Sequence, residues 1–415
     1  MHRETNASSV HNLLVDMTTK SLPPNFFHCP PLTLEEKESY KHQGVAAAYE
    51  VVKKTKLHGG PIKWKLNSDE RDLKIYKGID SSEPATSSGA TAFFATIEVV
   101  GTMDEVVDLF RSQTTEQAKE YVRRFGHLMA DAVNLYTIVP ATPEEPHEMI
   151  GISWRAFKPP VEGVVKRRDA CVLDVHHTFR VNGKRVWVRC IKSIEIACCP
   201  DLEKELGYIR MNHKCTGHVF SESDRPGYLH IDYLLQSDVR GTVGDYAKWI
   251  VDLSVKRRLR SAIYIDRFLR ENRLSKTPFL NAGELQPLSR TRVCSLCSRW
   301  LRILSKKSNC LKCGFVFCHQ CIQHWHVKNR GFDAVALVCN RCALGNEEHQ
   351  KRWLKEATSL VQDSYDHQIS IQRTTSRSAK SLPDEPRRSL SNYELLVAQN
   401  TQWKSPRVEN LMHSQ

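Results

Sequence analysis

The 415-residue sequence lacks a long apolar run. No stretch approaches the ~20 apolar residues that a membrane-spanning helix needs, and residues 1–20 contain no apolar core of the kind that a signal peptide requires. Catalytic signatures are missing as well, because there is no glycine-rich phosphate loop, no GxSxG and no HExxH. We therefore expect a cytoplasmic protein that is not an enzyme.

Acidic residues are outnumbered by basic ones. The chain has 60 Lys and Arg against 47 Asp and Glu, which gives a formal net charge of +13. This balance favours anionic partners, and both nucleic acid and acidic lipid surfaces fit it. With 40% hydrophobic residues the composition is otherwise typical of a globular protein, and the length predicts two or three domains.

Eight of the fourteen cysteines form four Cys-x-x-Cys pairs near the C-terminal end. Two thiolates at this spacing can turn back on one tetrahedral ion, so four pairs predict two closed sites for two Zn²⁺ ions. The alternative, a disulfide framework, needs an oxidising compartment. A segment of about 55 residues buries too little to be stable alone, so zinc would supply its folding energy. The predicted ligands are Cys294, Cys297, Cys310, Cys313, Cys318, Cys321, Cys339 and Cys342.

The gaps between successive pairs are 12, 4 and 17 residues. The short gap leaves too little chain for the second and third pairs to close on one ion. We therefore predict an interleaved arrangement, with pairs one and three on one zinc and pairs two and four on the other. This pattern resembles the FYVE-type zinc finger, a membrane-docking module. RING fingers have similar cross-braced metals but usually join the second and third pairs around a Cys-x-His step.

The phosphate-binding motif of that family is incomplete here. FYVE domains that read phosphatidylinositol 3-phosphate carry two basic residues, two histidines and then Cys-Arg-x-Cys-Gly. The corresponding stretch is Lys306-Lys307-Ser308-Asn309-Cys310-Leu311-Lys312-Cys313-Gly314. Both histidines and the arginine are replaced, and a phosphate monoester needs bidentate, charge-assisted donors to be held in one position. We expect weak or no selectivity for that lipid.

An apolar stretch precedes the two lysines and contains Trp300, Leu301, Ile303 and Leu304. In the FYVE family a loop at this position dips into the bilayer while basic residues lie at the headgroups. The resemblance therefore implies that Ile303, Leu304, Lys306 and Lys307 contact a membrane or a lipid headgroup. The alternative is a finger whose apolar residues are core and whose basic residues are a solvated face.

The chain before the finger reads as a mixture of helices and strands. Thr33 with Glu36, and Thr102 with Glu105, form capping boxes that predict helices to about Lys54 and through Phe110. A further helix is expected over residues 116–124. Strands are expected at 62–66, 73–76, 91–100, 149–157, 207–220 and 227–237, with a hairpin at 170–196 that turns at Asn182-Gly183. A long helix should follow from Thr242 to about Asn272.

This order of elements, with the local match Leu234-Leu235-Gln236-Ser237-Asp238-Val239-Arg240-Gly241, resembles the START lipid-binding fold. The resemblance implies an α+β helix-grip domain, in which a curved antiparallel sheet grips the long C-terminal helix and encloses an apolar tunnel for a lipid or sterol. The lid-side residues would be Tyr246, Trp249, Ile250 and Leu253. A domain with a filled core is the alternative, because any core helix shows such an apolar stripe.

The predicted organisation has five parts. They are a flexible leader (1–27), a START-like domain (28–275), a linker (276–289), a FYVE-like finger (290–345), and a short helix with a disordered Ser/Arg-rich tail (346–415). His176 and His177 stand next to each other in an expected strand. Their side chains should point to opposite faces, so they should not ligate one ion.

These observations predict a lipid-binding, membrane-associated adaptor. Its partners would be a lipid or sterol in the START-like domain and an anionic membrane surface or other proteins at the finger. It would associate peripherally with a membrane, with endosomes as one candidate. The alternative is a RING-like or general protein-interaction zinc finger beside a scaffold domain that binds no lipid. Nucleic acid is disfavoured, because the finger lacks the interleaved aromatic residues that base stacking needs.

Overall fold

The computed structural model describes residues 22–23, 25–70, 72–83, 91–124, 128–160, 165–240, 248–302 and 305–345. The chain divides into two compact units, Met1–Leu269 (unit 1) and Arg270–Gln415 (unit 2). Most of the predicted leader and all of the predicted tail beyond residue 345 lie outside the described residues. None of the helices in the described ranges is long and apolar enough to cross a membrane.

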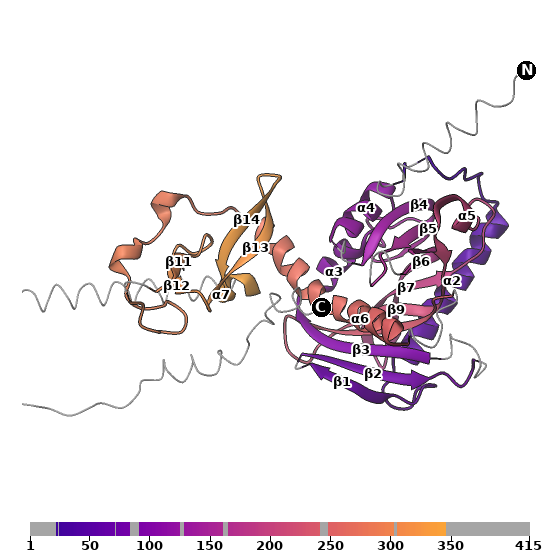
Figure 1. Ribbon diagram of the computed structural model, residues 1–415, viewed down its shortest axis with the longest axis horizontal. Coiled ribbons are helices and arrows are strands. Elements are labelled where there is room, and N and C mark those ends of the chain that lie inside the picture. The colour runs from indigo at the N-terminus through magenta and orange to yellow at the C-terminus, as the bar shows by residue number, and fades with distance from the viewer. Residues whose placement is uncertain are drawn as a thin grey trace, which may run out of the picture. The chain divides into compact units, whose positions relative to one another are not determined.

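A ten-stranded, mostly antiparallel sheet forms the centre of unit 1 (Figure 1). Its strand order is β1-β2-β3-β10-β9-β7-β6-β5-β4, and the short β8 pairs with β6 in parallel. The strands are β1 (Lys65–Glu70), β2 (Leu73–Ile79), β3 (Thr91–Val100), β4 (Met129–Val139), β5 (Met149–Phe157), β6 (Arg168–Val181), β7 (Lys184–Ser193), β8 (Ile209–Arg210), β9 (Asn212–Glu222) and β10 (Tyr228–Asp238).

Helices cover both faces of this sheet. Alternate residues of the strands form two separate cores, since successive side chains of a strand point to opposite faces. One core packs against α2 (Leu34–Lys54) through Ala48, Val51 and Val52. The other packs against α6 (Lys248–Ser275) through Leu259, Ala262 and Ile265, and it also includes α3 (Met103–Phe110).

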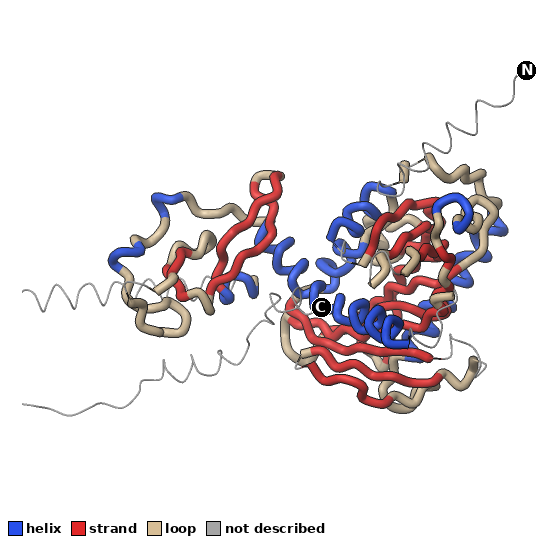
Figure 2. The backbone as a smooth tube through the Cα atoms, viewed as in Figure 1, coloured by secondary structure: helices blue, strands red, loops and turns tan. Residues whose placement is uncertain are grey.

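The face that holds α6 is the inner face of a curved sheet, as Figures 1 and 2 show. Unit 1 also contains two short helices, α4 (Thr115–Arg124) and α5 (Glu203–Leu206). The architecture is the helix-grip arrangement that the sequence predicted, with a long final helix held against a curved antiparallel sheet.

Local sequence signals account for several element ends. Both predicted capping boxes are present, with Thr33 bonded to the backbone of Glu36 and Thr102 bonded to the backbone of Glu105. The hairpin turn needs positive φ at both central residues, and Asn182 (52°) with Gly183 (79°) supplies it. Glycine has no Cβ to obstruct this conformation, so the turn and the register of β6 with β7 follow from two residues.

Other expectations were wrong or lie outside the described residues. The strand predicted at 62–66 begins at Lys65, while Ile62 forms only an isolated bridge to Asp80. Strand β4 was not predicted, because its pairing with β5 is irregular at three places and no alternation of apolar residues survives. The proposed cap of the long helix at Thr242 belongs to residues 241–247, which the structure does not describe.

The described part of unit 2 contains little regular structure beyond the end of α6. It has two small antiparallel pairs, β11 (Lys307–Asn309) with β12 (Val316–Cys318) and β13 (Ile322–Asn329) with β14 (Phe332–Cys339). A short helix, α7 (Asn340–Leu344), and two 3-10 turns, η3 (Ala282–Glu284) and η4 (Leu288–Arg290), complete it.

The stretch that the sequence marked as a linker is bonded into this unit. Leu280 donates its backbone N–H to the Leu311 carbonyl, and Gln286 donates to the Gly314 carbonyl. Residues 276–289 therefore form part of the frame of the finger.

Candidate functional site

Eight cysteines of unit 2 form two separate groups of four. The sulfur atoms of Cys294, Cys297, Cys318 and Cys321 all lie within 4.8 Å of one another, and so do those of Cys310, Cys313, Cys339 and Cys342. Pairs one and three therefore share one site and pairs two and four share the other, so the predicted interleaving is confirmed. In a tetrahedral zinc site with Zn–S bonds of about 2.3 Å, sulfur atoms lie roughly 3.8 Å apart. The 3.7 Å between Cys297 and Cys318 agrees with this.

Backbone N–H groups point at several of the sulfur atoms. Cys310 Sγ accepts from the N–H of Lys312 at 3.4 Å and of Cys339 at 3.3 Å, and Cys294 Sγ accepts from Cys318 at 3.4 Å. Such donors stabilise thiolates, which are the form that binds zinc. Each group offers four sulfur ligands, so a zinc ion bound there would be fully coordinated, as in structural zinc sites.

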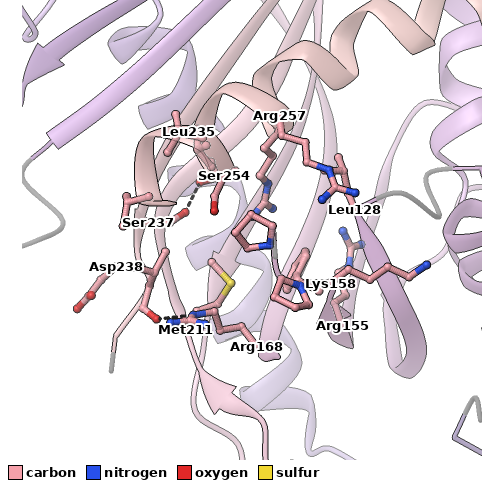
Figure 3. Close-up of a pocket in the computed structure, with 18 of the residues that line it drawn as sticks. Leu128, Arg155, Lys158, Arg168, Met211, Leu235, Ser237, Asp238, Ser254 and Arg257 are labelled. Carbon is pink, nitrogen blue, oxygen red and sulfur yellow. Dashed lines mark hydrogen bonds between the residues drawn. The ribbon is translucent and has the colours of Figure 1, made fainter. Parts of the chain in front are cut away.

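Unit 1 contains a cavity of about 1370 Å³ between the inner face of the sheet and α6 (Figure 3). The volume exceeds the ~300–1,000 Å³ that is usual for small-molecule pockets. Its apolar walls include Phe93, Phe157, Ile191, Met211 and Leu235 from the sheet. The last helix adds Val251 and Val255 to these walls.

Basic side chains outnumber acidic ones in the cavity lining. The basic residues are Lys77, Arg155, Lys158, Lys166, Arg168, Arg189, Arg210, Arg240, Arg257 and Arg258. The acidic residues are Asp201, Glu203, Asp238 and Asp252, and each of these is exposed or half-buried. Figure 3 shows Arg155, Lys158 and Arg257 on one side of the cavity and Arg168, Ser237 and Asp238 on the other.

Two of these arginines, Arg155 of β5 and Arg189 of β7, are only 5% and 4% exposed. Both lie beside Asp174 of β6, which is 2% exposed. Arg155 forms an ion pair with one oxygen of Asp174, and Arg189 Nε lies 3.5 Å from the other. Burial favours the neutral acid, but the two arginines hold the pKa of Asp174 well below its usual range. This buried cluster was not predicted.

No curated protein sequence matched this chain. The FYVE zinc finger family model matches residues 284–347. This match agrees with the interleaved cysteine groups. Together the family match and the two four-cysteine groups fit two zinc ions.

Three solved structures similar to part of this chain share 13–14% identity with it. Human StAR-related lipid transfer protein 5 has 14% identity and a TM-score of 0.44, and the match covers 56% of this chain and 98% of that one. Human STARD10 has 14% identity and a TM-score of 0.36, with 59% of this chain and 82% of that one covered. The human StarD13 (DLC2) lipid transfer and protein localization domain has 13% identity and a TM-score of 0.35, with 56% of this chain and 98% of that one covered. At these scores the START-like description rests on the strand order, the grip on α6 and the cavity of unit 1 itself.

Two of the positions that carry phosphate contacts in FYVE fingers, Lys307 and Asn309, are bonded internally in this one. Lys307 donates from Nζ to the Thr291 carbonyl at 2.9 Å. Asn309, at the second histidine position, donates from Nδ2 to the carbonyls of Gln286 (2.8 Å) and Gly314 (2.9 Å). Lys306 remains exposed. The motif therefore offers one exposed basic side chain, and it lacks the bidentate, charge-assisted donors that would hold a phosphate in one position.

The other predicted membrane residues divide into two groups. Ile303 and Leu304 lie outside the described residues. Of their neighbours, Trp300 is 63% exposed, whereas Leu301 is 4% exposed and belongs to the core of the finger.

The predicted cavity residues of the last helix can be placed only in part. Tyr246 lies outside the described residues, as do the side chains of Trp249 and Ile250. Leu253 is 40% exposed and does not line the cavity, whereas Val251 and Val255 do. His176 and His177 point to different sides, since His176 contacts the Trp187 ring in the buried core and His177 bonds to Glu148.

Proposed function

We propose that this protein is a lipid-binding, membrane-associated adaptor. Unit 1 holds a lipid or sterol, and the zinc finger docks on an anionic membrane surface or on another protein. The observation that carries this proposal is the cavity of about 1370 Å³ between the inner face of the sheet and α6. Its apolar walls suit acyl chains or a sterol body, because transfer of such groups out of water is favourable.

Native mass spectrometry of the full-length chain purified from cells tests this proposal. We expect a mass that includes two zinc ions and one hydrophobic ligand. The Val255→Trp variant should reduce ligand retention, because the side chain of Val255 lines the cavity and the larger ring would occupy its volume. Leu253→Trp on the same helix is the matched control, since Leu253 lies outside the cavity.

A ligand that is retained equally by both variants would place lipid binding elsewhere. Absence of any ligand, even after incubation with mixed lipid vesicles, would leave unit 1 as a scaffold that binds no lipid and favour the protein-interaction alternative.

Membrane docking by the finger should depend on charge and should not distinguish phosphatidylinositol 3-phosphate. Lys307 and Asn309 already bond to backbone carbonyls, so the motif lacks the preorganised donors that a phosphate monoester needs. In vesicle co-sedimentation we expect less than about a twofold preference for that lipid over phosphatidylserine at equal surface charge, and weaker binding at high salt. A FYVE domain with the complete histidine and arginine motif is the positive control, and a tenfold preference here would contradict the prediction.

A further inference from the structure

The inner face of the sheet carries a row of polar side chains among apolar ones. The strand register places His176 of β6 opposite Arg189 of β7, Arg189 opposite His218 of β9, and His218 opposite Tyr233 of β10. The rings of His218 and Tyr233 stack with their centroids 3.9 Å apart. Of these four residues, Arg189, His218 and Tyr233 line the cavity, so the row forms part of its wall.

The charges next to this row do not balance. Arg155 and Arg189 share the single carboxylate of Asp174, which leaves one positive charge in a part of unit 1 that is almost fully buried. Burial lowers the pKa of His176 to about 3, with further lowering by Arg189 and Arg155, so this side chain is neutral near pH 7. Burial also places the pKa of His218 well below its usual range. Buried charges in proteins are normally paired, because an unpaired one is costly to remove from water.

The two arginines keep donors that no described side chain uses. Arg155 bonds through Nε to Ser153 and through Nη2 to Asp174, and no described acceptor bonds to its Nη1. The Nε of Arg189 has no hydrogen-bond partner among the described residues, although Asp174 lies 3.5 Å away. The Arg189 side chain hydrogen-bonds to Tyr121, and its guanidinium lies over the rings of Phe110 and Tyr121, at 4.9 and 5.1 Å from their centroids. The Nδ1 atom of His218 is also unpartnered within the described chain.

We propose that Arg155 and Arg189 form an anion subsite inside the cavity, and that the ligand of unit 1 is a lipid with an anionic head, a phosphate or a carboxylate. The head supplies the missing negative charge and bonds to the two guanidiniums, and its apolar part lies along Phe93, Ile191 and Leu235. Guanidinium groups suit this role, since their planar forks match both phosphate and carboxylate. Asp174 is a positioning residue, because it holds both arginines at the wall.

This inference rests on the proposed lipid-binding function, so the experiment must separate the two. Full-length protein is incubated with vesicles that contain equal amounts of phosphatidic acid and phosphatidylcholine with identical acyl chains, then isolated and analysed by native mass spectrometry. Both lipids are in the same vesicle, so the protein meets them at one membrane, and the Arg189→Gln variant, which leaves the finger unchanged, separates retention in the cavity from retention at the finger. We expect phosphatidic acid to be enriched at least about tenfold over phosphatidylcholine on the protein, as charge-assisted bonds to a buried head require.

Three variants identify the source of the enrichment. Arg189→Gln leaves Arg155 and Asp174 as a neutral pair, so the enrichment should fall to near one. Arg189→Lys keeps the charge and should retain most of it. The double variant Asp174→Asn with Arg189→Gln leaves Arg155 as the only charge of the cluster, so the enrichment should return.

Each other outcome has a distinct meaning. Equal retention of both lipids by the unsubstituted protein overturns the subsite and leaves the lipid cavity intact, and this comparison needs no variant to fold. Saturable binding of glycerol 3-phosphate with no retained lipid would show that the subsite serves a soluble phosphate, which overturns the lipid assignment. Retention of no ligand at all overturns both the subsite and the proposed function.

Discussion

Replacing Cys310 with serine is expected to unfold the zinc finger. Cys310 is buried among the second group of four sulfur atoms and accepts two backbone N–H bonds, from Lys312 and Cys339. A structural zinc ion contributes about 10–16 kcal/mol of folding free energy in small zinc fingers, and a unit of this size has too little core to compensate. Because the two sites share interleaved chain segments, loss of one should destabilise the other.

The measurement is zinc content by native mass spectrometry together with limited proteolysis. We expect the Cys310→Ser chain to fall from two bound zinc ions to one or none, with new cleavage between residues 284 and 345. Cys198→Ser is the control, because Cys198 is a half-buried cysteine of unit 1 that belongs to neither metal group. A Cys310→Ser protein that keeps both zinc ions and resists protease would contradict the prediction.

Lowering the pH from 7.5 to 5.5 is expected to destabilise unit 1 strongly. Burial lowers the pKa of His176 to about 3 and moves the pKa values of His213 and His218 well below the usual range for histidine. In the unfolded chain the same side chains bind a proton near pH 6.5. Below that pH the unfolded state therefore binds more protons than the folded state, so the free energy of unfolding decreases as the pH falls.

Each such histidine contributes about 1.4 kcal/mol per pH unit, so three of them give a slope of up to roughly 4 kcal/mol per unit below pH 6.5. This is a large part of the ~5–15 kcal/mol by which domains are usually stable. The slope can be measured by chemical unfolding of the full chain at pH 7.5, 6.5 and 5.5, with the unfolding transition of unit 1 monitored at each pH.

Variants of single histidines check the origin of this slope. His218→Phe should make it shallower by about 1.4 kcal/mol per pH unit, because the phenyl ring can keep the stacking on Tyr233 and cannot bind a proton. His230 is the opposite case, since its bond to Asp232 raises its pKa. Its contribution is present at low pH and is lost as the pH rises, so His230→Gln should not make the slope shallower. A slope that is unchanged in the His218→Phe protein would show that His218 is not the source.

Short-range signals were enough to predict much of the fold. The capping boxes at Thr33 and Thr102 defined two helix starts, and the Asn182-Gly183 turn defined the hairpin of β6 and β7. These features depend on a few neighbouring residues, so a single sequence contains the whole of their cause. Strand β4 and the start of β1 were not predicted, because both pair irregularly with the next strand and so lack a regular apolar alternation.

The zinc sites could be predicted from the sequence, whereas the buried charge cluster could not. The four-residue gap between the second and third Cys-x-x-Cys pairs disfavoured a shared ion and favoured the interleaved pairing, and the structure has that pairing. Arg155, Asp174 and Arg189 lie in three different strands, and β6 and β7 carry other charged residues as well, so nothing in the sequence marked these three as neighbours. The sequence by itself determined the metal ligands, the helix caps and the alternation of strand faces, since each depends on bonds or spacing within one segment. Only the tertiary structure decided which charged side chains meet on the inner face and how much space remains beneath α6, because strand register and the packing of a helix on a sheet bring together residues that are far apart in the chain.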